Sequence, residues 1–424
     1  MSNIVFIVDA EEGHVIPSFG LARSLKERGH HIVYLSIIDN EELVKEQGFE
    51  FYPIFEDIYY KGYRNQYKKL SLPPGVKQNG DRKLQNAYSK HVAELMNGKL
   101  DGLLEQLRAD LYIINTFLQT DILILHYKFK INPVVLTPFL RESGRTLASD
   151  CFEYLTNVDT EEINSLIEFL ETCHVNIQSL TQLATPFNSF CEIVVCPREL
   201  EIDDHAIGLN VHHIEPSIRK STGGQNVFSL FQIPANKKII YGSMGSQPVR
   251  HGETCRLFFE KIISALQSQE LADCHLVLSI GPEFSIESLG QIPPNVSIAR
   301  WVPQIDILKV AAAAIIHGGL GSVKECIYYG VPIIVFPLGF DQPLNAKRVA
   351  HHKLGIAADI GTVSVNEIRS YLLEVMTNEE IKISIRKMQS IFQEKESLKP
   401  GVTIVENMLA NQNKRSEEIV TLEL

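Results

Sequence analysis

The chain has 424 residues, which is enough for two or three domains that each bury a core of their own. Apolar residues make up 45% of it and charged residues 21%, and this globular composition excludes a mostly disordered chain. The formal net charge of −11 argues against binding of nucleic acid or of an anionic membrane through bulk charge.

The N-terminus and the cysteines indicate a cytoplasmic location. The first residues, MSNIVFIVDAEEGH, lack a basic leader and turn acidic at Asp9, unlike a secretory signal peptide. No apolar run reaches the roughly 18 residues of a membrane-spanning helix, so we expect no integral membrane association. The seven cysteines are an odd number without a C-x-x-C pair, which indicates free thiols rather than a disulfide framework or a zinc cluster.

The first half of the chain alternates short apolar runs with stripes of apolar residues at helical spacing. The expected strands are residues 3–8, 31–36, 50–54, 111–115, 133–138 and 193–197. The expected helices are residues 16–28, 40–47 and 160–190. Strands that alternate with helices predict a parallel sheet with right-handed crossovers. Residues 57–95, with tyrosines among lysines and arginines, interrupt this alternation and are interpreted as a long excursion with a binding loop and helices.

A second α/β series follows the segment 216–237, whose Pro, Ser, Gly-Gly and Lys residues are typical of a linker. Its expected strands are residues 238–243, 275–280, 296–300, 313–317 and 332–336. Its expected helices are residues 253–268, 304–311, 320–329, 343–353 and 364–376. We therefore expect Rossmann-like domains in 1–215 and 238–390, and a helical tail in 391–424 that returns to the first domain. Ligands of such sheets bind at the carboxyl ends of the strands, which predicts a central cleft between the domains.

The signatures of the common nucleotide cofactors are missing. G-x-G-x-x-G does not follow the first strand, where Gly13 stands alone, and the Walker P-loop is absent. We therefore predict no NAD or FAD cofactor. The histidine and cysteine spacings predict no metal site either.

The most informative stretch is 301–346, which contains the run AAIIHGGLGS. Its first half is expected to form a buried strand, GGLG a turn, and the residues after it a helix. Glycines let a backbone approach a ligand closely, and the amides at the start of a helix attract an anion. The turn from Gly319 through Gly321 to Ser322 is thus a ready phosphate cradle, and His317 ends the strand that leads into it.

The side chains around this cradle suit a nucleoside and a sugar. Ser322 and Glu325 are three residues apart, so they share a helix face, and Glu325 is placed to accept bonds from a ribose diol. The single tryptophan, Trp301, follows a strand, and an exposed indole there suits stacking on a base. Asp341 and Gln342 follow the neighbouring strand, where an acid beside an amide suits sugar hydroxyls. Each of these residues also has an ordinary packing, capping or solvent-facing interpretation, but those interpretations do not predict the whole set at these spacings.

This stretch resembles the donor-binding signature of the family 1 glycosyltransferases, the UDP-sugar-dependent GT-B enzymes that glycosylate small lipophilic acceptors. The matching residues are Trp301, Gln304, His317, Gly318, Gly319, Ser322, Glu325, Gly330, Pro332, Pro337, Asp341, Gln342 and Asn345. GHVIP (13–17) resembles the family's acceptor-side motif, and YGSMGS (241–246) resembles its first C-terminal loop. HGGLGS is the form of the bacterial members, of the macrolide and natural-product type.

The resemblance implies a GT-B fold of two Rossmann-like domains and a role for each matching position. The base and ribose contacts that it implies are those of Trp301, Gln304 and Glu325. The implied diphosphate contacts are those of Ser243, Ser246, His317, Gly318, Gly319, Gly321 and Ser322. The implied hexose contacts are those of Asp341 and Gln342, with Gln342 as the reader of glucose. No metal or other cofactor is implied, because helix amides, His317 and hydroxyls would stabilise the departing diphosphate.

The implied general base is His14, which follows the first strand on the acceptor side. An ordinary histidine pKa near 6.5 suits removal of a proton from an attacking hydroxyl. The family orients this histidine with a carboxylate at the end of a later strand, but here that position holds Asn115, which cannot offset an imidazolium charge. Three explanations stay open. A nearby acid substitutes, either Asp121 or the flanking Glu11 and Glu12; the acceptor hydroxyl is acidic enough to need little help; or Asn115 only packs.

Together these residues predict an inverting hexosyltransferase. It would move a hexose, glucose by the Gln342 assignment, from a UDP-sugar or dTDP-sugar to a hydroxyl of a lipophilic small molecule such as a polyketide, macrolide, carotenoid or phenolic. Two other classes stay open on the same architecture: a nucleotide-sugar epimerase of the UDP-GlcNAc 2-epimerase type, and a nucleotide-sugar binding protein without turnover. The GHVIP turn and the Asp341-Gln342 pair argue against the epimerase.

Overall fold

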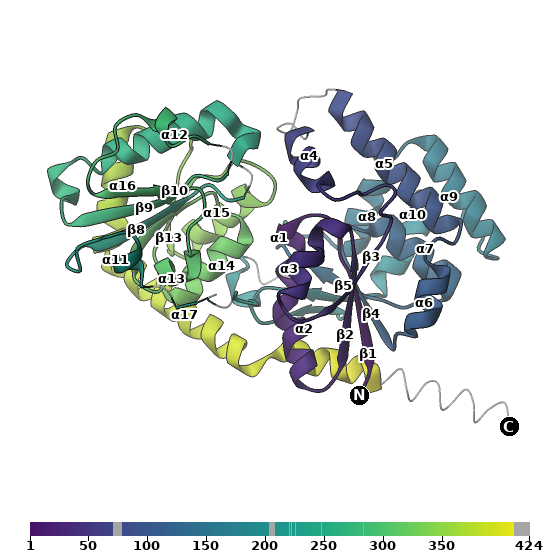
Figure 1. Ribbon diagram of the computed structural model, residues 1–424. Coiled ribbons are helices and arrows are strands. Elements are labelled where there is room, and N and C mark those ends of the chain that lie inside the picture. Colours follow the sequence, from purple (N-terminus) through teal and green to yellow (C-terminus); the bar gives the residue numbers. More distant parts are fainter. Residues whose placement is uncertain are drawn as a thin grey trace.

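Two parallel sheets organise the computed structural model (Figure 1). The structure describes residues 1–70, 79–202, 208–219, 221, 223–224, 226–246, 248–282 and 284–410. The N-terminal sheet has seven strands in the order β3-β2-β1-β4-β5-β6-β7, and the C-terminal sheet has six in the order β10-β9-β8-β11-β12-β13. Neighbouring strands pair in parallel in both sheets, which confirms the predicted α/β architecture.

The N-terminal sheet follows the predicted strands closely. Its strands are β1 (Asn3–Ile7), β2 (His31–Ser36), β3 (Glu50–Pro53), β4 (Leu111–Asn115), β5 (Val134–Thr137), β6 (Cys191–Val194) and β7 (Val211–His213). The α-helices beside it are α1 (Glu12–Val15), α2 (Ser18–Glu27), α3 (Glu41–Lys45), α4 (Tyr63–Leu70), α5 (Asn79–Met96), α6 (Asp101–Leu107), α7 (Gln119–Phe129), α8 (Leu147–Thr156), α9 (Thr160–Thr172) and α10 (Leu180–Ala184). Helices on both faces bury the central strands, which explains why β4 is apolar up to its last residue. The centre of the predicted excursion, 71–78, lies outside the described residues.

The C-terminal sheet lies beyond the predicted linker. Its strands are β8 (Lys238–Ser243), β9 (Cys274–Ser279), β10 (Val296–Ala299), β11 (Ala311–Ile316), β12 (Ile333–Val335) and β13 (Gly355–Ala357). The α-helices of this part are α11 (Val227–Leu230), α12 (Gly252–Ala265), α13 (Gln304–Leu308), α14 (Leu320–Tyr329), α15 (Gln342–His351), α16 (Val365–Thr377) and α17 (Glu379–Leu398). Six 3-10 helices complete the list: Ile38–Asn40, Thr185–Asn188, Arg198–Leu200, Pro248–His251, Gln269–Leu271 and Glu287–Leu289. No helix of the described residues is long and apolar enough to cross a membrane.

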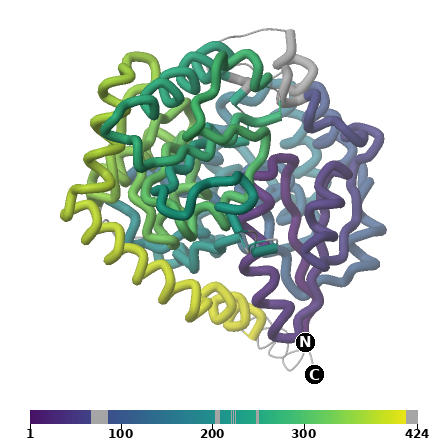
Figure 2. Tube along the Cα trace, turned by 60° about the vertical axis from the view of Figure 1, so that its left-hand side comes forward, coloured from purple at the N-terminus to yellow at the C-terminus, as the bar shows by residue number. Residues whose placement is uncertain are grey.

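The C-terminal end of the described chain crosses from the second sheet to the first (Figure 2). Helix α17 packs against α14, turns at Lys399 in a left-handed conformation, and continues as a helix over 400–410. There Val402 and Val405 join the core under the N-terminal sheet, and the Gly401 amide donates to Glu215 at 2.9 Å. The C-terminal end of the described chain is therefore attached to the N-terminal domain. The predicted tail beyond 410 lies outside the described residues.

The segment that follows β6 also ties the two domains together. The Lys324 ammonium, buried on α14, donates to the Val195 carbonyl at 2.7 Å. Arg348 on α15 pairs with Glu201 at 2.8 Å, and His352 lies 2.9 Å from the Glu201 carbonyl. A buried lysine needs such a partner, because an unpaired buried charge is costly.

The strand orders place two topological switch points where polar residues were predicted. The chain reverses direction of winding between β1 and β4 in the first sheet, and between β8 and β11 in the second. Open parallel sheets bind ligands at such switch points, beyond the carboxyl ends of the strands. His14 follows β1, and the predicted phosphate cradle follows β11.

Candidate functional site

His14 lies on α1, and its ring is oriented by an acid that the sequence analysis did not propose as its partner. Its Nδ1 lies 2.7 Å from Oδ2 of Asp9, the second residue after β1. An ionised carboxylate only accepts hydrogen bonds, so we assign the proton to Nδ1 and the free lone pair to Nε2. Burial lowers the pKa of His14, but Asp9, followed by Glu11 and Asp341, raises it by more, so the pKa lies above its ordinary value. The only sequence signal for Asp9 was its place five residues before His14.

Asn115 holds two backbone groups rather than the His14 ring. Its side chain is fully buried at the end of β4. Its Nδ2 donates to the His14 carbonyl at 3.3 Å, and its Oδ1 accepts from the Phe117 amide at 3.0 Å. An aspartate could accept from Phe117 but could not donate to the carbonyl, so the amide fits this position better than the expected carboxylate.

The suggested acid partners Asp121 and Glu12 make other bonds, and these two suggestions are corrected here. Asp121 is buried on α7, where its Oδ1 lies 2.7 Å from Nε2 of His91 on α5. Glu12 pairs with Arg64 of α4 at 2.9 Å. Closeness in sequence to Asn115 suggested Asp121, and closeness to His14 suggested Glu12, whereas the partner depends on which way each helix turns its side chains.

An aromatic ring covers one face of the His14 imidazole. The Phe117 ring stacks on it with centroids 3.9 Å apart and planes 16° from parallel. Phe139 packs against Phe117 at 5.4 Å, and the Arg141 guanidinium lies over Phe139 at 5.4 Å. Phe117 nevertheless remains 42% exposed, which is unusual for so large an apolar side chain. The sequence analysis missed Phe117, which no motif marked.

His317 follows β11 and lies between two glycines. A side chain at Gly245 or Gly319 would come within 2.6 Å of its Nε2, so only glycine leaves room for this ring. Its Nδ1 is buried without a hydrogen-bond partner among the described residues. Burial, with a smaller contribution from His251, lowers the pKa of His317 to about 4. The ring is therefore neutral at pH 7, and an unsatisfied nitrogen beside the cradle suits an added ligand.

The cradle itself joins the loops after β8 and β11. Gly319 caps the ten-residue helix α14, and Ser322 lies in its first turn. A side chain at Gly321 would meet nothing within 4 Å, which leaves the backbone there open to a ligand. Ser243 accepts from the Gly245 amide at 3.2 Å, and Ser246 lies half-buried in the same loop. Exposed helix-start amides and hydroxyls of this kind can hold an anion.

Glu325 is engaged by a linker residue that the sequence analysis did not single out. Arg219 donates to it from two guanidinium nitrogens, Nε to Oε1 at 2.6 Å and Nη2 to Oε2 at 2.9 Å. Gln304 donates to the same carboxylate at 2.5 Å and accepts from the Tyr241 hydroxyl at 2.7 Å. The two residues predicted to bind ribose therefore do lie together. In this structure Arg219 occupies the oxygens that a ribose diol would use.

The remaining predicted donor residues lie around the same region. Trp301 follows β10 and is 59% exposed, so its indole face is free to stack. Asp341 caps α15 and accepts from Asn345 at 2.8 Å. Gln342 accepts from the amides of Leu338 and Gly339 with its Oε1, which fixes the turn before it. The adjoining Phe340 has a left-handed backbone, a strained state that functional loops tolerate.

Asp341 and His14 come from different domains but influence each other. The Asp341 charge raises the pKa of His14, and His14 opposes the larger effect of burial, which raises the pKa of Asp341. Charges act strongly only over short distances in a protein, so the predicted base and the predicted sugar contact lie near one another.

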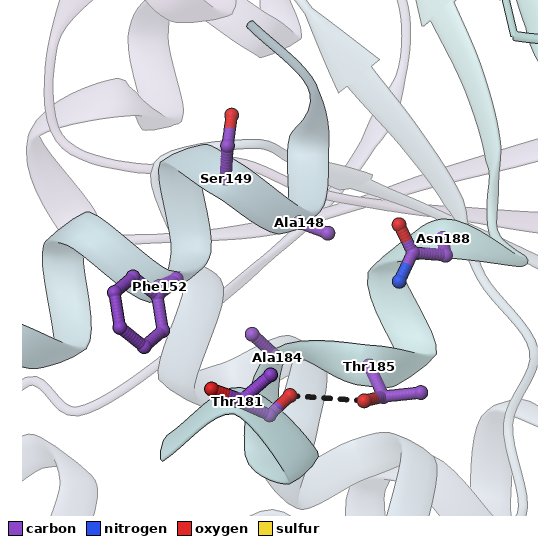
Figure 3. A pocket seen from close by; sticks show the side chains of 7 residues that line it. All are labelled: Ala148, Ser149, Phe152, Thr181, Ala184, Thr185 and Asn188. Atoms are coloured by element: carbon purple, nitrogen blue, oxygen red, sulfur yellow. Dashed lines mark hydrogen bonds between the residues drawn. The ribbon is translucent and has the colours of Figure 1, made fainter.

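A separate hollow lies on the N-terminal domain between α8 and the segment of α10 with the 3-10 helix 185–188 (Figure 3). It is lined by Ala148, Ser149, Phe152, Thr181, Ala184, Thr185 and Asn188. None of the predicted site residues lines it, and its walls carry no ionisable side chain. We assign the hollow no part in the site.

Comparisons with known proteins agree with this geometry. Residues 264–401 match the family of the erythromycin biosynthesis protein CIII-like C-terminal domain. An uncharacterised UDP-glucosyltransferase of Bacillus subtilis (strain 168), YojK, is 25% identical over 390 residues, which cover 89% of this chain and 90% of YojK. The zeaxanthin glucosyltransferase of Pantoea ananas is 24% identical, over 92% of each chain.

Solved structures extend the likeness to the whole fold. The glycosyltransferase of kitacinnamycin superposes with a TM-score of 0.75 at 23% identity, covering 97% of this chain and 98% of that one. The calicheamicin glycosyltransferase CalG4 gives 0.74 at 20% identity, covering 98% and 99%. These neighbours confirm the GT-B fold, and the sequence relatives confirm the resemblance of this chain to the family 1 glycosyltransferases of the natural-product type.

Proposed function

We propose that this protein is an inverting glycosyltransferase that moves glucose from UDP-glucose to a hydroxyl of a lipophilic small molecule. The names of its relatives support the donor and the kind of acceptor, since one is a UDP-glucosyltransferase and another acts on zeaxanthin. No metal or other cofactor takes part in the proposed reaction, in which the nucleotide sugar is a substrate.

The observation that carries the proposal is the pair of His14 and Asp9, whose Nδ1 and Oδ2 atoms lie 2.7 Å apart. A transferase needs a base for the acceptor and a holder for the donor sugar at one point. An epimerase needs no acceptor base, and a binding protein needs no base at all. An Asp9–His14 pair opposite the donor residues therefore favours transfer over both alternatives.

The residues divide the reaction between the domains. Nε2 of His14 accepts the hydroxyl proton as the acceptor oxygen attacks the anomeric carbon, and the bond from that carbon to the diphosphate breaks. Asp9 holds the ring in the correct tautomer and stabilises the imidazolium. The α14 amides, Ser322 and His317 would stabilise the diphosphate as it leaves. Attack from the side opposite the diphosphate inverts the anomeric carbon.

The test is a panel of UDP-glucose and dTDP-glucose with carotenoid, macrolide and phenolic acceptors, read by mass spectrometry and by UDP release. We expect UDP release that depends on an acceptor and disappears in His14→Gln. Epimerised donor without an acceptor would establish the isomerase instead. Binding of UDP without any release would establish a binding protein.

The same panel tests the hexose contact. Gln342→Ala should reduce the preference for glucose over other hexoses while UDP still binds, with Lys347→Ala on the same helix as a control. Unchanged donor choice and rate in Gln342→Ala would remove that residue from the sugar site.

A further inference from the structure

Phe117 lies beside the proposed base, and the mechanism proposed above gives it no role. It is an exposed aromatic residue stacked almost parallel on the proposed base, at 3.9 Å between ring centroids. Phenylalanine usually stabilises a fold by being buried, but here 42% of the residue stays exposed. Its position beside His14 therefore calls for an explanation other than core packing.

The backbone is built to hold this stack. Asn115 accepts from the Phe117 amide and donates to the His14 carbonyl, so one buried amide side chain fixes both residues. Phe139 supports the outer side of Phe117. The position where the family has a carboxylate thus serves here to place an aromatic ring against the histidine.

We propose that Phe117 is a positioning residue for His14, and that the face of its ring stabilises the imidazolium formed when His14 takes the acceptor proton. The inference rests on the proposed function, in which His14 is the base. The negative face of an aromatic ring attracts a cation stacked on it. Phe117 thus supplies part of the stabilisation that a carboxylate at position 115 would give.

The charged groups around His14 are consistent with this role. Asp9 binds Nδ1 from the end of β1, Glu11 lies on the same turn, and Asp341 acts from the other domain. From the end of β4 and the turn after it, the neighbours are Asn115 and Phe117, which carry no charge. The ring face of Phe117 is therefore the source of negative potential on that side.

The proton balance is simple. The acceptor O–H bond breaks and an N–H bond forms at Nε2, while the acceptor oxygen bonds to the anomeric carbon and the departing UDP keeps the electron pair of the broken bond. His14 then carries a proton on each nitrogen until it returns one to water. Phe117 lowers the free energy of that charged state only, so it takes part without touching the reacting atoms.

The experiment titrates His14 in the free protein by NMR, with ¹³C,¹⁵N-labelled histidine and His14→Gln to identify the signal. Phe117→Leu keeps an apolar cover over the ring but removes the aromatic face, whereas Phe117→Tyr keeps both. We expect the leucine variant to lower the pKa of His14 by roughly half to one and a half units, and the tyrosine variant to stay close to wild type. Phe117→Met serves as a second aliphatic variant.

An unshifted pKa in both aliphatic variants, or an equal shift in Phe117→Tyr, would overturn the proposal. A merely structural Phe117 would change KM without moving the acidic limb of kcat/KM, whereas a positioning Phe117 moves that limb downward together with the NMR pKa. The NMR titration uses no substrate. A failure of the proposed function would therefore appear in the transfer assay, whereas a failure of this inference would appear in the NMR titration.

Discussion

Replacing Asp9 by asparagine removes the charge that orients and stabilises His14. Asp9→Asn retains the size of the side chain and an oxygen that can accept from Nδ1. What it loses is the attraction between the carboxylate and the imidazolium, which exists only after His14 has taken the proton. The change should therefore lower kcat on an alcohol while leaving UDP affinity unchanged.

The structure sets the size of this effect. Two charges about 4 Å apart interact by about 4 kcal/mol at an effective dielectric constant near 20. The His14 and Asp9 side chains are 28% and 17% exposed, so water weakens the pair. A loss of about 2–4 kcal/mol corresponds to a rate lower by roughly 30- to 1,000-fold. On a phenol, whose hydroxyl is already acidic, the loss should be smaller.

The pH dependence of kcat/KM should also change in Asp9→Asn, in a direction that the structure predicts. Asp9 raises the pKa of His14, so its removal lowers that pKa and moves the acidic limb of kcat/KM to lower pH. Glu11→Gln is the matched control, because it removes the same charge from a residue that contributes less. The assay is UDP release from UDP-glucose with an aliphatic alcohol and with a phenol. Equal rates in Asp9→Asn and wild type, or an acidic limb that moves upward, would refute the assignment.

Three further predictions follow from buried groups. Asn115→Asp should lower the unfolding free energy by about 1–3 kcal/mol, because a carboxylate cannot donate to the His14 carbonyl. It should also reduce the rate of transfer to the alcohol. Denaturant titration checks the first effect and the transfer assay the second. Glu325→Gln should weaken UDP by about 1–3 kcal/mol in calorimetry, whereas Arg219→Gln should tighten uridine by freeing the carboxylate; unchanged dissociation constants would remove this pair from the ribose site. His317 has a folded pKa of about 4, below its unfolded value, so its stabilisation is lost as pH falls from about 6.5 to 4. His317→Asn should flatten part of that fall in thermal or denaturant unfolding, and an unchanged slope would contradict it.

The donor half of the site was predictable because its residues are close in sequence. Trp301, His317, Glu325 and Asp341 all lie within residues 301–341, where short helices and strands alternate, so sequence spacing indicated that they lie in one region. The parallel pairing of the strands was predictable from the alternation of strands and helices. The helix α7 was missed because it is buried, and its run ILIL carries no polar stripe to reveal a helical period.

The acceptor half depended on contacts between distant segments. Asp9 was passed over because the family's acid was expected at position 115, more than a hundred residues away. Phe117 and Arg219 carry no motif, and each becomes part of the site only through a partner on another element. The packing of α7 against α5 decides the direction in which the Asp121 side chain points, and no local sequence pattern predicts that packing.

The bonds from Lys324 and Arg348 to the segment after β6 have a consequence for motion. They hold α14, the helix that also carries Glu325, and α15 against the N-terminal domain. If the two domains open, we expect them to rotate about this segment as a hinge. Residues beside the hinge would move little. The contact between α4 and the turn 248–251 joins the two domains away from the hinge, so residues there would move further. We therefore expect α4 to move further than Glu325 when the domains open.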